Sequence, residues 1–149
     1  MKTYKAKRYV LNMAFKIFLY TNVLADHLLD RNRNSSEVIR AVESGRVIAF
    51  ASSASFFTLA VIIEKKLKMN AGLILDFLCR LLTIVPTSQA NLVQAFASRF
   101  ADLEDAFQYY TAKNITDLDF FVTNNVKDFA SVAGKPAVIS ANEFVEKFL

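Results

Sequence analysis

The sequence predicts an α/β domain with a central parallel sheet of about five strands and helices on both sides of it. Short apolar runs alternate along the chain with longer segments of helical period, which is the pattern of strand-helix-strand winding. The length of 149 residues suits one domain, and a composition of 54% hydrophobic and 21% charged residues supplies one packed core. No Ser-, Pro-, Gly- or charge-rich stretch reads as a linker within it.

Five apolar runs are the predicted strands. They are residues 16–20 (KIFLY), 46–51 (RVIAFA), 82–85 (LTIV), 118–123 (LDFFVT) and 137–139 (AVI). In sheets of this kind, ligands bind in the crevice beyond the carboxyl ends of the strands. The residues that directly follow each run are therefore the expected functional positions.

The segments between and after these runs are predicted helices. They are residues 34–45, 52–68, 72–82, 88–100, 102–113 and the segment from 140 onwards. Asn34 with Glu37, and Ser140 with Glu143, form capping-box patterns, and Gly45 is a helix-ending signal. Together with the strands, these helices predict βαβ winding.

The first twelve residues stand apart from the rest by their charge. We interpret residues 1–12 as an N-terminal extension or basic arm and residues 13–149 as a single domain. The net charge of +4 favours an anionic partner but is too small to identify one. The basic residues of this segment are Lys2, Lys5, Lys7 and Arg8.

The start of the chain does not resemble a signal peptide. Asn12 and Lys16 interrupt the apolar run, and no small-residue cleavage site follows it. No uninterrupted apolar stretch reaches about 20 residues, so we expect no membrane-spanning helix. We therefore expect a cytoplasmic protein.

Several kinds of site are disfavoured by the residues that the chain lacks. Three glycines, at 45, 72 and 134, form neither a dinucleotide-binding loop nor a P-loop. The single histidine, His27, has no nucleophile in a recognisable arrangement and is expected to be a surface or packing residue. The single cysteine, Cys79, lies among apolar residues and is expected to be a buried, unreactive thiol, which excludes an internal disulfide and a cysteine-rich zinc site.

Three aspartates are placed as a metal site would need them. Asp102 and Asp105 lie three residues apart at the start of a predicted helix, and Asp128 follows the fourth strand. Converging carboxylates repel one another unless Mg²⁺ or Mn²⁺ neutralises them, and such an ion can promote phosphodiester cleavage. The alternative is structural: Asp102 and Asp105 stabilise a helix N-terminus, and Asp128 is a solvated turn residue.

Three motifs in order resemble the PIN domain family. Residues 16–32 (KIFLYTNVLADHLLDRN) resemble the opening of these domains, in which an apolar strand is followed by D-T-N; here Tyr20, Thr21 and Asn22 stand in those positions. Residues 100–112 (FADLEDAFQYYTA) resemble the third acidic motif, and residues 118–129 (LDFFVTNNVKDF) the strand followed by T-N-x-x-x-D-F. The resemblance runs from about residue 13 to residue 149.

This resemblance implies a Rossmann-like PIN fold and a metal-dependent endoribonuclease. Many small bacterial members of the family are VapC-like toxins of toxin-antitoxin systems, which bind Mg²⁺ or Mn²⁺, cleave RNA, are inhibited by a cognate antitoxin and often form homodimers. The expected metal ligands are Asp102, Asp105 and Asp128. The expected polar supports are Asn22, Thr123 and Asn124, with Thr58 at the position where many members carry a glutamate.

Tyr20 stands where the resemblance places the first catalytic aspartate. A phenol with an ordinary pKa near 10 brings no charge at neutral pH, and its ring fills space that an ion would need. We therefore expect ribonuclease activity to be low or absent. Three explanations stay open: selection against a toxic activity during expression, a natural degenerate member, or a role of its own for Tyr20.

Two other classes of function are weighed beside the nuclease. A degenerate PIN fold could serve as a binding module for an antitoxin or for RNA, with basic residues contacting phosphates. A phosphate-accepting signalling domain would need an acceptor aspartate after a central strand, and residues 85–87 (VPT) after the third run provide none. The basic residues are Arg31, Arg33, Lys65 and Lys66.

Overall fold

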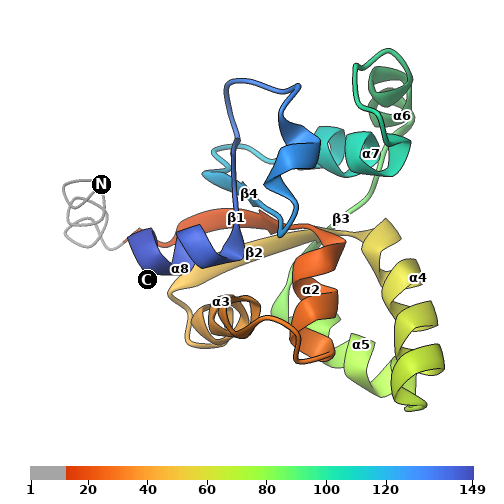
Figure 1. The fold of residues 1–149 in the computed structure, drawn as a ribbon, viewed down its shortest axis with the longest axis vertical. Helices are drawn as coiled ribbons and strands as arrows, with labels where there is room; N and C mark the ends of the chain where they lie inside the picture. The colour runs from red at the N-terminus through yellow and green to blue at the C-terminus, as the bar shows by residue number, and fades with distance from the viewer. Residues whose placement is uncertain (1–12) are drawn as a thin grey trace.

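The computed structural model describes residues 13–149 and contains one five-stranded parallel sheet (Figure 1). The strand order is β3-β2-β1-β4-β5, and every neighbouring pair runs parallel. The predicted α/β class and parallel sheet are thus confirmed. The basic arm predicted for residues 1–12 lies outside the described residues. The strands are β1 (Phe15–Leu19), β2 (Val47–Ser52), β3 (Thr83–Val85), β4 (Phe120–Val122) and β5 (Ala137–Ile139).

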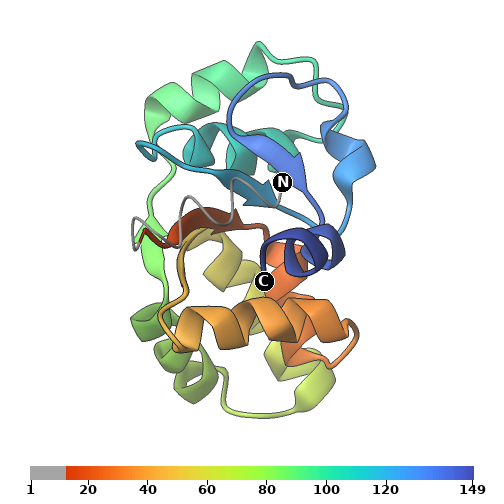
Figure 2. The ribbon, with the colours of Figure 1, turned by 90° about the vertical axis from the view of Figure 1, so that its left-hand side faces the viewer.

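Helices cover both faces of the sheet, as Figures 1 and 2 show. On one face lie α2 to α5 and α8, and on the other lie α6 and α7. No helix within residues 13–149 is long and apolar enough to cross a membrane. The elements are α2 (Thr21–Leu28), α3 (Arg33–Glu43), α4 (Ser53–Ile62), the π-helical η1 (Ile63–Leu67), α5 (Ala71–Leu81), α6 (Gln89–Phe96), α7 (Leu103–Ala112), the 3₁₀ turn η2 (Val126–Phe129) and α8 (Ala141–Phe148).

The alternation of side chains along β1 creates two cores. Ile17 and Leu19 belong to the larger apolar core, which α2, α3 and α8 also build. Phe18, between them, faces a smaller aromatic core with Tyr109 of α7 and Phe121 of β4. Because successive strand residues point to opposite faces, a strand that is apolar at every position but Lys16 needs cover on both sides. The β1 sequence therefore fixes it at the centre of the sheet.

The predicted helix starts after Ser88, Asp102 and Ser140 are confirmed by hydrogen bonds of their side chains to helix N–H groups. The helix predicted over residues 34–45, which is α3, begins elsewhere than predicted, because Asn32 and not Asn34 is its cap. The Asn32 side chain accepts from two backbone N–H groups, and Glu37 pairs with Arg40 in place of completing a capping box.

The long helix predicted over residues 52–68 is interrupted. The α-helical hydrogen bonding ends at Ile62, and a π-helical segment continues to Leu67. Lys68 then takes a left-handed conformation with φ +50° and stops the segment. The helix predicted to reach residue 100 also stops early, at Phe96.

Candidate functional site

Tyr20 and Asp105 meet at the carboxyl edge of the sheet. Tyr20 directly follows β1, and its phenol donates a hydrogen bond of 2.6 Å to Oδ1 of Asp105 on α7. Its backbone is held on both sides, since its N–H donates to the carbonyl of Val122 and its carbonyl accepts from Val23, each at 3.0 Å. Asp105 is only 6% exposed. At the position where the motif led us to expect an aspartate, the chain thus presents a phenol to Asp105.

Aromatic packing fixes the ring of Tyr20 in this position. Its centroid lies 5.8 Å from that of Phe129 in an edge-on contact and 6.0 Å from that of Phe121 in a tilted contact. Phe121 and Phe129 also contact each other, with centroids 4.7 Å apart. Offset and edge-on ring pairs of this kind add stability beyond their buried area. The phenol is therefore anchored at its ring and at its hydroxyl.

The electrostatics of the pair keep the phenol neutral. Burial raises the pKa of Tyr20, and the hydrogen bond to Asp105 and the charge of that carboxylate raise it further. Burial also raises the pKa of Asp105, an effect that the hydrogen bond from Tyr20 opposes and that the charges of Asp102 and Asp128 increase. Tyr20 therefore supplies a proton donor and no negative charge.

The other two predicted metal ligands have different surroundings. Asp102 is exposed and caps α7, its Oδ1 accepting from the N–H of Glu104 at 2.8 Å, which is the structural role weighed for it from the sequence. Asp128 lies exposed in η2. Both influence Asp105 electrostatically, yet residues 13–149 contain no group of three or more His, Cys, Asp or Glu placed to hold a metal ion. The residues present do not fit a divalent-ion centre.

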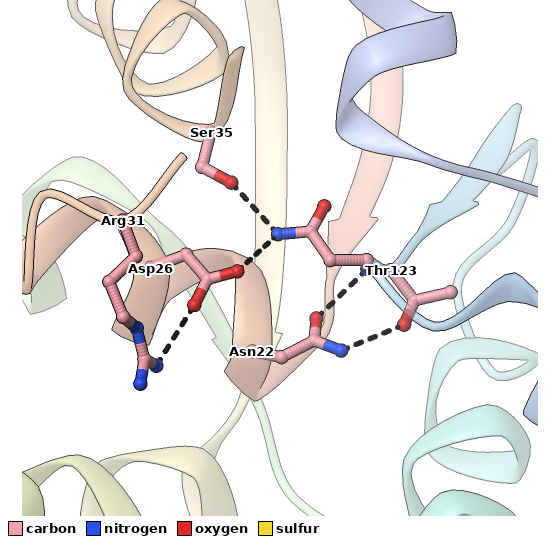
Figure 3. Close-up of polar contacts among 6 residues, drawn as sticks. Asn22, Asp26, Arg31, Ser35 and Thr123 are labelled. Atoms are coloured by element: carbon pink, nitrogen blue, oxygen red, sulfur yellow. Dashed lines mark hydrogen bonds and ion pairs between the residues drawn. The ribbon is translucent and has the colours of Figure 1, made fainter. Parts of the chain in front are cut away.

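The predicted polar supports form one hydrogen-bond network between α2 and the loop after β4 (Figure 3). Asn22 Nδ2 donates to Thr123 Oγ1 at 3.2 Å, and Asn22 Oδ1 accepts from the N–H of Asn124 at 3.1 Å. Asn124 Nδ2 donates to Asp26 Oδ2 at 2.7 Å and to Ser35 Oγ at 3.0 Å. Asp26 and Ser35 were missed by the sequence reasoning, although Asp26 lies four residues after Asn22 on the same helix face.

The last of the predicted site residues, Thr58, is exposed on α4. Ser55, one turn before Thr58, is instead the buried polar residue of this helix. Its hydroxyl lies 2.7 Å from Thr21 Oγ1 and accepts from Gln108 Nε2 at 3.2 Å.

The single histidine and the single cysteine differ in how well their burial was predicted. His27 is half-buried, with Nδ1 2.8 Å from Ser36 Oγ, in line with its predicted packing role. Cys79 is exposed, so its predicted burial is wrong. Its neighbour Leu78 faces the core at 1% exposure, and one residue along a helix turns the side chain by about 100°. Apolar neighbours in the sequence therefore do not bury Cys79.

A separate apolar pocket lies between α2 and α5. Its volume is about 310 Å³. Leu73 and Phe77 on its α5 side are 74% and 54% exposed, so the pocket is bordered by exposed apolar surface, which is typical of interaction sites. The lining residues are His27, Leu28, Leu73, Ile74, Phe77 and Leu78.

Comparison with known proteins agrees with this architecture. A toxin-antitoxin complex from Klebsiella pneumoniae gives a TM-score of 0.63 at 24% identity, covering 84% of this chain and 97% of the other. DNA-bound VapBC from Salmonella typhimurium gives 0.63 at 16% identity, covering 85% and 98%. A sarcin-ricin loop cleaving VapC toxin of Mycobacterium tuberculosis gives 0.59 at 11% identity, covering 78% and 96%. These likenesses show a shared fold.

The sequence itself identifies the family. No curated protein sequence matches the chain. The profile of the PIN domain, however, matches residues 16–127, which is well over half of the chain and includes Tyr20, Asp105 and the network of Asn22. The chain belongs to the PIN domain family.

Proposed function

We propose that this chain is a VapC-like PIN domain of a toxin-antitoxin system whose metal-dependent endoribonuclease centre is closed by Tyr20. The observation that carries the proposal is the 2.6 Å hydrogen bond from the Tyr20 phenol to Asp105, at the carboxyl edge of the sheet. In this form the domain binds a protein partner in the cytoplasm and cleaves RNA weakly or not at all.

The chemistry of Tyr20 supports the loss of cleavage. Mg²⁺ and Mn²⁺ take oxygen ligands, preferably anionic ones, and a phenol held protonated beside Asp105 supplies no anion. The phenol also uses one oxygen of Asp105 that a metal would need. Removal of even an indirect support of a metal site typically costs about 10- to 100-fold in affinity or activity. Loss of a direct ligand should cost at least as much.

The test of this proposal is the substitution Tyr20→Asp. With Mg²⁺ or Mn²⁺, Y20D is expected to cleave RNA at least about 100-fold faster than the chain as given. Y20D/D105N serves as the control, because it has the new carboxylate but lacks the buried acid. Metal-dependent cleavage by the unsubstituted chain, or an inactive but folded Y20D across a broad RNA panel, would refute the closed-nuclease proposal.

The pocket between α2 and α5 is the proposed binding site for a protein partner. Solved structures of similar fold contain toxin-antitoxin complexes, and a pocket lined by exposed Leu73 and Phe77 suits an apolar segment of a second protein. We propose an antitoxin as that occupant. RNA binding has less support, since Arg31, one of the predicted phosphate contacts, is engaged by Asp26 at 2.9 Å.

Matched phenylalanine substitutions test where the partner binds. Phe77 lines the pocket and is 54% exposed, whereas Phe57 on α4 is 75% exposed and lies outside the pocket lining. Co-expressed with the product of the adjacent reading frame, F77E is expected to lose the partner in co-purification and F57E to keep it. Loss through F57E alone would place the interface elsewhere.

A further inference from the structure

Asp105 is a buried carboxylate in the first turn of α7, where the helix dipole favours its charge but its side chain has a single hydrogen-bond partner. Within residues 13–149 its one hydrogen bond is the one from Tyr20, and none of the ion pairs formed there includes it. The nearby acids Asp102 and Asp128 add repulsion. A buried charge without a partner is strongly destabilising, so this single contact matters for the folded state.

We infer that Tyr20 takes over the structural task of a cation beside Asp105: its hydroxyl compensates this carboxylate, so that the domain is stable without a divalent metal. The inference rests on the proposed function only in treating the surroundings of Asp105 as a closed metal centre. It concerns stability, which can be measured independently of RNA cleavage.

One neutral donor suffices because only one of the three acids is removed from water. Asp105 is 6% exposed, whereas Asp102 and Asp128 are exposed and remain solvated. A charge-assisted hydrogen bond is roughly twice as strong as one between neutral groups, and this one has a length typical of that class. The donor therefore lies at the least exposed of these three carboxylates.

The surroundings of Tyr20 hold the donor in place. Its backbone is held by hydrogen bonds with Val122 and Val23. Its ring is held by contacts with Phe121 and Phe129. Phenylalanine at this position would keep the ring packing and lose the donor. Aspartate would lose both and set a second carboxylate opposite Asp105, which calls for a cation.

A double-mutant cycle tests the compensation. In chelator, Y20F is expected to lower the melting temperature by roughly 5 °C when Asp105 is present. When D105N is already present, adding Y20F should lower the melting temperature by no more than half as much. Y110F is the matched control, because Tyr110, on α7, is half-buried like Tyr20. Its hydroxyl forms no hydrogen bond within residues 13–149. A Y20F loss that equals that of Y110F, or that D105N leaves unchanged, would overturn the inference.

Melting in chelator and in Mn²⁺ tests the replacement of the cation. The melting temperature of the unsubstituted chain is expected to be the same in chelator and in Mn²⁺, and so is that of Y20N. The melting temperature of Y20D is expected to rise by several degrees in Mn²⁺. An equal gain in the unsubstituted chain would overturn the inference. A folded Y20D that gains nothing would instead refute the closed metal centre of the proposed function, and if Y20D does not fold, the Y20F cycle decides.

Discussion

At the scale of single residues, the burial of an ionisable group decides how much its charge matters for the stability of the fold. Asp105 is shielded from water and accepts from Tyr20, whereas Asp102 is exposed and caps a helix. Both acids come from one motif, so their types and spacing alone do not separate these roles. The position of Tyr20 follows from motif order, but its bond to a residue 85 positions away depends on packing against Phe121 and Phe129, which no local pattern encodes.

His27 provides a prediction about pH at the same scale. Burial lowers its pKa from the ordinary 6.5, while Glu43 and Asp30 act to raise it and Arg40 to lower it. The unfolded chain therefore takes up a proton at higher pH than the folded one. The stability from neutral His27 is fully present above pH 6.5 and is lost as the pH falls through the lowered pKa.

Urea unfolding between about pH 7.5 and pH 5 measures this effect. H27Q is expected to reduce the loss of unfolding free energy as the pH falls. An unchanged pH profile in H27Q would show that His27 is not responsible.

At the scale of elements, one polar network joins α2, α3 and the loop after β4. Asn124 is its central residue, since it bonds Asp26 and Ser35 through its side chain and Asn22 through its backbone. Asn22 and Asn124 could be predicted from the motifs. Ser35 could not, because it belongs to a helix whose approach to the loop depends on the whole sheet.

Asn124→Ala is expected to destabilise the domain by about 2 kcal/mol, because the hydroxyl of fully buried Ser35 loses the donor that Asn124 provides. Urea unfolding of N124A and of N125A, which alters an exposed neighbour, gives the comparison. Equal free energies of unfolding for the two variants would contradict a bracing role for Asn124.

At the scale of the whole molecule, the order of apolar runs and helices was enough to predict the fold. Each of the five runs overlaps one of the five strands, and the inner strands β1 and β4 are largely buried, as continuously apolar parallel strands are. Three details were predicted wrongly, because the sequence pattern allows more than one local structure. Asn32 caps α3 in place of Asn34, the helix after β2 changes to π geometry at Ile63, and the side chain of Cys79 is exposed. These outcomes depend on side-chain direction and tertiary contacts.

The central claim is that a PIN domain retains its architecture while Tyr20 closes its metal centre. Calorimetric titration of the folded chain with Mn²⁺, beside Y20D, tests this claim most directly. We expect no saturable binding by the unsubstituted chain and saturable binding by Y20D that disappears in Y20D/D105N. Saturable Mn²⁺ binding by the unsubstituted chain that D105N abolishes would contradict the account.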